Sequence, residues 1–153
     1  MDRMPLITLL LYSIPEELLI FTFGLIILGQ KVHFPRVLGT SVLAAVGTYF
    51  IRLLPLPFGF NAIISVALII VLFMVLFKMN FKQAFLATLL CTSTLLALEN
   101  SVTLLLEMQL GLSIEKIWQE PLLRTLIGWP NLFIFAFVTW FIYKKRIRLN
   151  IVK

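Results

Sequence analysis

The sequence predicts an all-α, polytopic integral membrane protein that consists of a single transmembrane helix bundle. Composition and pattern both support this prediction. Hydrophobic residues make up 61% of the 153-residue chain and charged residues only 13%, against about 25% charged residues in a typical soluble domain. The hydrophobic residues gather into five runs of about 20 residues, the length at which an α-helix crosses a ~30 Å hydrocarbon core.

Polar residues, prolines and glycines separate the five runs. The first run ends at QKVHFPR (residues 30–36), and the second ends at PLPFG (residues 55–59). The short stretch KMNFK (residues 78–82) lies between the third and fourth runs, and a mixed stretch precedes the fifth. We therefore expect about five transmembrane helices, over residues 4–29, 37–54, 60–77, 83–106 and 121–143.

The first run contains an acidic pair, within the stretch YSIPEELLIF (residues 12–21). After Glu17, only 12 residues remain before the run ends at Gly29, and these form ~18 Å of helix at ~1.5 Å per residue. Residues before Glu17 are therefore needed to cross a ~30 Å core. We expect Glu16 and Glu17 within the outer half of the membrane, with a helix kink at Pro15.

Basic residues predict the orientation of the helices. In the five-span arrangement nine of them fall on one side, and four fall toward the other together with all seven acidic residues. The positive-inside rule makes the first side cytoplasmic, so we expect the N-terminus outside and the C-terminus inside the cell membrane. The nine are Lys31, Arg36, Lys78, Lys82, Lys144, Lys145, Arg146, Arg148 and Lys153, and the four are Arg3, Arg52, Lys116 and Arg124.

Four of the five runs carry ionisable residues at a similar predicted depth. Counted from the cytoplasmic ends of the helices, these residues lie roughly 18–29 Å above the inner boundary at ~1.5 Å per residue. Charges at such depth usually face the interior of the bundle or a wet cavity. We therefore expect an outward-facing polar cluster that binds a ligand or a partner. Its members are Glu16, Glu17, Arg52, Glu99, Asn100 and Arg124.

Two other interpretations of the same residues remain open. The cluster could be a purely structural set of ion pairs, or its arginines could extend to the outer membrane interface.

Small residues at helical spacing, such as Thr40 and Ala44 or Ala84 and Thr88, predict that the second and fourth helices are buried in the bundle. The bulky third run is expected to face lipid. Residues 112–121 are expected to form a short interfacial helix capped by Ser113.

No motif in the sequence indicates an enzyme. His33 and Cys91 could suggest a cysteine peptidase, but His33 is expected in a cytoplasmic loop and Cys91 inside the fourth helix. Metal-binding, phosphate-binding and Ser/His/Asp motifs are absent from the sequence. We expect neither a cofactor nor nucleic-acid binding, because the basic residues separate hydrophobic runs and do not form a basic face.

Two stretches carry a family resemblance: TYFIRLLPLPFGFN (residues 48–61), followed by a hydrophobic run, Lys78 and Glu99, and EPLLRTLIGWPN (residues 120–131). They resemble the membrane sensor region of bacterial sensor histidine kinases with a GHKL-type ATPase domain, relatives of the quorum-sensing receptors. The chain ends ten residues after Tyr143. The resemblance therefore implies a sensor-like module without its kinase domain.

The sequence thus predicts a sensor-like or regulatory module in a bacterial cell membrane that takes part in signal transduction. It would bind a small molecule, a peptide, another membrane protein or a second copy of itself through the polar cluster. Its basic tail would contact anionic lipid or a cytoplasmic partner. A small transporter or transporter subunit and a structural subunit of a membrane complex are the alternatives. The tail residues are Lys144, Lys145, Arg146 and Arg148.

Overall fold

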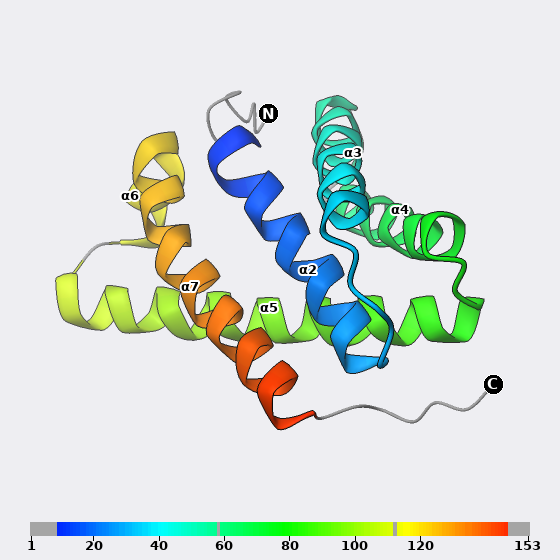
Figure 1. Cartoon of the computed structure of the whole chain (residues 1–153). Helices are drawn as coiled ribbons and strands as arrows, with labels where there is room; N and C mark the ends of the chain where they lie inside the picture. Colours follow the sequence, from blue (N-terminus) through cyan, green and yellow to red (C-terminus); the bar gives the residue numbers. More distant parts are fainter. Residues whose placement is uncertain (1–8, 58, 112, 147–153) are drawn as a thin grey trace.

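The computed structural model describes residues 9–57, 59–111 and 113–146, and the regular secondary structure of these residues is entirely helical. This confirms the all-α prediction, and each of the five expected segments corresponds to a helical segment (Figure 1). In order, the elements are η1 (Leu9–Ser13, a π-helical turn), α2 (Ile14–Ile27), α3 (Phe34–Leu53), α4 (Phe60–Leu76), α5 (Phe81–Leu110), α6 (Ile114–Gln119) and α7 (Pro121–Lys145).

Three helices are long and apolar enough to cross a membrane, namely α3, α5 and the Thr125–Lys145 part of α7. The apolar helix α4 is shorter, with 17 residues. The described part of the first segment is divided between η1 and the 14-residue α2. Length and composition therefore suit a membrane protein, while five crossings and their orientation stay predictions.

Helix α2 forms the centre of the fold and packs against α3, α5 and α7. Figure 1 shows α2 between α7 and α3, with the long α5 running crosswise to α2 and α7. Aromatic contacts also join α2 to α4 and to α7. The ring centroids of Phe21 and Phe73 of α4 lie 4.8 Å apart, and those of Phe23 and Phe135 of α7 lie 5.3 Å apart. All four rings are almost fully buried.

The end of α2 is set by a glycine. Gly29 has a left-handed φ of 71°, a conformation that costs glycine little. Its N–H donates to the carbonyl of Ile26, and the N–H of Gln30 donates to the carbonyl of Leu25. This pair of bonds is a Schellman motif. It ends the helix and directs the chain toward α3.

The small residues of the second and fourth helices are buried, as predicted. Thr40, Ala44, Ala84 and Thr88 are each at most 2% exposed. The expectation that the third run only faces lipid is wrong in part, because Phe73 of α4 is fully buried.

The burial of Phe73 has a local cause in α2. A Cβ atom at Gly24 would lie 2.7 Å from Cζ of Phe73, so the absence of a side chain at Gly24 makes room for the ring.

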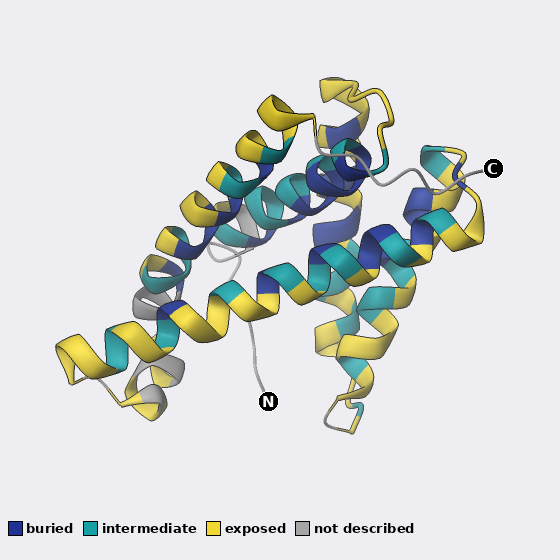
Figure 2. Cartoon of the chain, turned by 90° about the horizontal axis from the view of Figure 1, so that it is seen from below, coloured by how far each residue is buried: buried dark blue, intermediate teal, exposed yellow. Residues whose placement is uncertain are grey.

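The two halves of α5 differ in burial (Figure 2). Its first half supplies core residues, among them Ala87, Cys91 and Leu95. Most side chains of its second half are exposed, including Leu104 and Met108. The helix then ends, and α6 forms within the range 112–121 expected for a short helix. Ser113 occupies its N-cap position, but the expected side-chain capping hydrogen bond is not made.

Candidate functional site

The first segment changes helix type at the acidic pair. Pro15 lies in the first turn of α2, directly after the π-helical turn η1. Proline has no N–H, and its ring clashes with the carbonyl of the residue four positions earlier in a regular α-helix. Single π-helical turns relieve such local conflicts and occur frequently at functional sites. The disturbance expected at Pro15 therefore takes the form of a π-helical turn followed by an α-helix.

Glu17 is buried in the fold, with 7% of its surface exposed. Its Oε2 atom is buried and has no hydrogen-bond partner. On α2, Glu17 shares a face with Ile20 and Phe21, three and four positions later, and both of these residues are core residues. One oxygen of the carboxyl group is thus buried without a hydrogen-bond partner, on a helix face that also carries apolar core residues.

Two other members of the predicted cluster lie near this carboxyl group. Glu16 and Arg52 are both close enough to act electrostatically on Glu17. Arg52 is in the last turn of α3, and its side chain is exposed. The structure therefore brings together Glu16, Glu17 and Arg52, with only Glu17 in the interior.

A second buried polar group lies in α7. Asn131 is 1% exposed, and neither its Nδ2 nor its Oδ1 has a hydrogen-bond partner. It directly follows Pro130, a proline inside the helix. The missing N–H of Pro130 leaves the carbonyl of Leu126 without its usual intrahelical donor. A missing intrahelical hydrogen bond within the continuous helix α7 therefore accompanies the unpaired amide.

Contacts between η1, α2 and α7 place Asn131 at the level of Glu17. The Tyr12 ring lies against Gly128, where it would clash with an added Cβ atom, and Phe23 packs against Phe135. Along η1 and α2, Glu17 lies between Tyr12 and Phe23. Along α7, Asn131 lies between Gly128 and Phe135.

Two further buried polar atoms have no hydrogen-bond partner, Oγ1 of Thr48 in α3 and Oδ1 of Asn61 in α4. Thr48 is near the end of α3, and Asn61 is the second residue of α4. All four residues therefore lie away from the turn that joins α2 to α3. Glu17, Thr48, Asn61 and Asn131 each have a buried side-chain polar atom without a hydrogen-bond partner, and we call this set of four residues the buried polar layer. A buried polar group without a partner costs about 1–3 kcal/mol. A ligand that forms a hydrogen bond with one of these atoms would remove this cost.

No known protein family, curated protein or solved structure matches this chain. The function of the chain is therefore inferred from its own residues. Within the described ranges, no group of three or more His, Cys, Asp and Glu side chains could hold a metal ion.

The remaining predicted site residues lie elsewhere or outside the described side chains. Glu99 and Asn100 are exposed on α5, and the side chain of Arg124 is not among those described. Thr48, Asn61 and Asn131 are not among the predicted site residues, because the prediction selects ionisable residues at a similar depth and the amide next to one of them. The proline next to Asn131, inside a hydrophobic run, was a usable signal.

The basic tail begins at the end of α7. Nζ of Lys144 lies 4.9 Å from the centroid of the Trp140 ring, and Nζ of Lys145 lies 5.9 Å from that of Phe141. Arg146 instead lines a cleft near the end of α2. Arg148 lies outside the described residues.

Proposed function

We propose that this chain is a multi-pass cell-membrane protein that acts as a sensor-like or regulatory binding module. Its buried polar layer would bind a small-molecule or peptide ligand, or a polar group of a partner membrane protein. One observation carries the proposal: the buried carboxyl group of Glu17 has an oxygen without a hydrogen-bond partner. Intramembrane ionisable residues are costly and usually functional.

The chemistry of the layer indicates the kind of ligand. Glu17 can accept hydrogen bonds from an ammonium, guanidinium or amide group. The side-chain amide of Asn131 both donates and accepts. The surrounding side chains are aromatic and aliphatic, which suits a ligand that is mostly apolar and has one or two cationic or amide groups.

The second half of α5 supports a protein partner. It exposes Leu96, Leu104 and Leu105 together with Glu99 and Asn100. A second membrane helix that covers this surface would bury the leucines and satisfy the polar groups. The resemblance to kinase sensor regions agrees with such a partner, and a sensor role in bacterial signalling is part of this proposal.

A small transporter is the second candidate, and two irregular points in the helices favour it. The π-helical turn before Pro15 and the proline at position 130 both lie beside members of the buried polar layer. Interrupted helices at membrane depth are typical of transporter substrate sites. In that case Glu17 would carry a proton or hold a cationic substrate.

A ligand screen on the purified protein tests the binding proposal. The thermal stability of the protein in detergent would be measured with a panel of hydrophobic amines and short peptides. A ligand present at 100 times its Kd stabilises the folded state by about 2.7 kcal/mol. We expect hits that stabilise the wild type and fail to stabilise Glu17→Gln or Asn131→Leu, with Glu99→Gln as the matched exposed control.

Liposome experiments separate the two candidates. Proton or substrate flux that depends on Glu17 would favour the transporter, and ligand binding without flux would favour the binding module. Ligands that stabilise the wild type and Glu17→Gln equally would contradict the role of the buried polar layer in both.

A further inference from the structure

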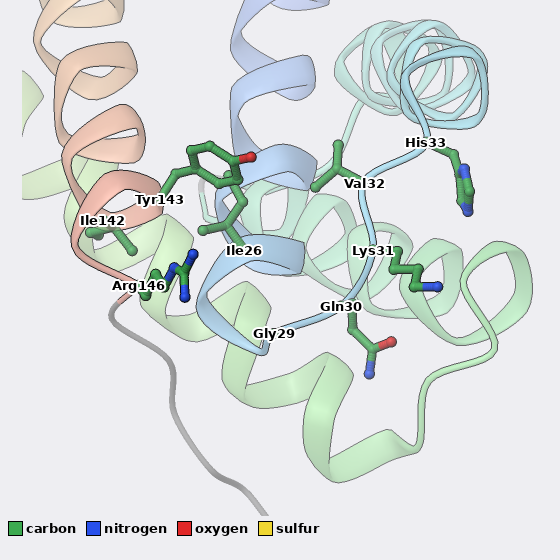
Figure 3. A pocket seen from close by; sticks show the side chains of 9 residues that line it. All are labelled: Ile26, Gly29, Gln30, Lys31, Val32, His33, Ile142, Tyr143 and Arg146. Atoms are coloured by element: carbon green, nitrogen blue, oxygen red, sulfur yellow. The ribbon is translucent and has the colours of Figure 1, made fainter.

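A cleft of about 510 Å³ lies between the turn after α2 and the end of α7. Figure 3 shows Tyr143 and Arg146 projecting from α7 toward α2, while Gln30, Lys31 and His33 extend from the connecting segment and point away from α7. Ile26, Val32 and Ile142 complete most of the lining. The cleft lies at the opposite end of α2 from Glu17, so it is separate from the buried polar layer.

Two left-handed residues shape this cleft. The Schellman motif at Gly29 ends α2 and turns the chain, so that the following residues run extended toward α3. Arg146 has a φ of 54°, which ends α7. In that conformation its N–H donates to the carbonyl of Tyr143.

The charge of the cleft favours an anion. Among the lining residues Lys31 and Arg146 are permanent cations, and none is acidic. Two helix C-termini border the cleft, and helix C-termini ordinarily disfavour anions. Here the carbonyls of Leu25, Ile26 and Tyr143 already accept hydrogen bonds from the capping residues. The positive charges of Lys31 and Arg146 therefore outweigh the two helix C-termini in the electrostatics of the cleft. Gln30, His33 and the Tyr143 hydroxyl add neutral or ionisable hydrogen-bonding groups.

The position of the cleft indicates that its ligand is a lipid. The neighbouring residues Trp140 and Lys144 form a cation–π contact, and aromatic and basic residues of this kind gather at membrane interfaces. Val32 and Phe34 expose 39% and 63% of their surface beside the cleft. Apolar walls next to cations match a molecule with a charged phosphate and a hydrocarbon part.

We propose that this cleft binds the phosphate headgroup of an anionic membrane phospholipid. Arg146 would hold the phosphate through two parallel N–H donors, and the flexible side chain of Lys31 would turn from the far rim of the cleft toward it. Ile26, Val32 and Ile142 would contact the glycerol and the first acyl carbons. The inference shares the membrane location with the proposed function and does not depend on the buried polar layer. Basic pockets between membrane helices bind anionic headgroups in this way.

Binding of phosphatidylglycerol to the full chain in neutral detergent tests the inference. Native mass spectrometry would count bound lipids over a concentration series, with phosphatidylcholine as the zwitterionic reference. We expect one phosphatidylglycerol molecule to bind more tightly than phosphatidylcholine. Removing one of the two cations should weaken binding about fivefold. The variants are Lys31→Gln and Arg146→Gly, and glycine is compatible with the left-handed conformation at position 146.

Lys145→Gln is the matched control, because Lys145 lies over Phe141 and is not among the residues that line the cleft. It should change the affinity less than twofold. An equal loss in Lys31→Gln and Lys145→Gln would indicate general attraction to a basic surface and would overturn the proposal. Absence of saturable phosphatidylglycerol binding would also overturn it.

Competition with inorganic phosphate distinguishes the two sources of the anion. Phosphate at millimolar concentration should leave phosphatidylglycerol bound, because the lipid also uses the apolar walls. Displacement by phosphate alone would mean that the cleft is a site for soluble phosphate. Glu17→Gln should bind phosphatidylglycerol like the wild type, so the result does not depend on the fate of the proposed function.

Discussion

The thiol of Cys91 in α5 donates a hydrogen bond to the backbone carbonyl of Ile20 in α2, with 3.3 Å between sulfur and oxygen. Cys91 is fully buried, and this carbonyl also belongs to the helical turn that follows Glu17. The contact joins two helices that are far apart in the sequence. It lies where they approach closely enough for Ala87 to meet Gly24.

Substitutions at Cys91 should depend on size more than on chemistry. Cys91→Ser keeps a donor for the Ile20 carbonyl, so we expect it to change the free energy of unfolding by no more than about 1 kcal/mol. Cys91→Leu adds volume to a closely packed contact and should destabilise the fold by about 1–3 kcal/mol. Unfolding in mixed SDS and neutral detergent measures both. Equal stability of the two variants would contradict the close approach of α2 and α5.

Two glycine-to-alanine substitutions should act in opposite directions. In Gly24→Ala, the new Cβ atom would lie 2.7 Å from Cζ of the buried Phe73. We expect destabilisation by about 1–3 kcal/mol from overpacking. Gly39 lies in α3 with nothing within 4 Å of its added Cβ atom, so Gly39→Ala should stabilise the fold by up to about 1 kcal/mol. The same SDS unfolding assay compares the two variants. Destabilisation by Gly39→Ala would contradict the open space next to Gly39.

Replacement of Glu17 should increase stability. Glu17→Leu removes a buried carboxyl group with an unpaired oxygen, and we expect a gain of about 1–3 kcal/mol in the free energy of unfolding. Loss of the Glu17 carboxyl group should destabilise the fold little through Arg52, because the exposed Arg52 side chain stays in contact with solvent. The exposed control Glu99→Leu should stay within about 0.5 kcal/mol of the wild type. A large loss of stability in Glu17→Leu would show that the carboxyl group is structural.

The turn before α5 contains a residue in a strained conformation. Lys78 has a φ of 52°, which costs a non-glycine residue roughly 1–2 kcal/mol. Lys78→Gly should therefore stabilise the fold by about 1 kcal/mol. Lys82→Gly, an equal change of charge in the first turn of α5, should destabilise it by about 1 kcal/mol. Thermal unfolding of both variants checks the difference in sign.

Helix positions could be predicted from the sequence because hydrophobic runs and their breaks are local signals. The end of the second run at residue 54 and the end of α3 at Leu53 agree closely. The fourth helix is predicted to end at residue 106, because a mixed stretch with polar residues begins at Glu107. In the structure the helix continues to Leu110 and ends at Gly111, which has a left-handed φ of 62°. The tight contact of Phe73 with Gly24 could not be predicted, since it depends on tertiary packing.

Only part of the candidate site could be predicted. The proximity of Glu17 to Arg52 follows from the predicted helices and their charges, and the structure agrees with it. The depth of Glu17 in the membrane stays a prediction. Depth along a helix does not specify the direction of a side chain. That is why Glu99, at a similar predicted depth, is exposed. Asn131 was not predicted because the expected cluster consists of ionisable residues and one amide next to Glu99, although the burial of Asn131 leaves two polar atoms without a hydrogen-bond partner.

The length of α5 has a consequence for the lipid around the protein. Its 30 residues extend about 45 Å at ~1.5 Å per residue, against a hydrocarbon core of ~30 Å. In the proposed membrane arrangement the helix must therefore tilt strongly or extend beyond the core, and each ångström of mismatch costs a fraction of a kcal/mol. A thinner or thicker bilayer would change the preferred tilt of α5, and with it the position of the surface that carries Glu99. The protein would then respond to bilayer thickness even without a bound ligand.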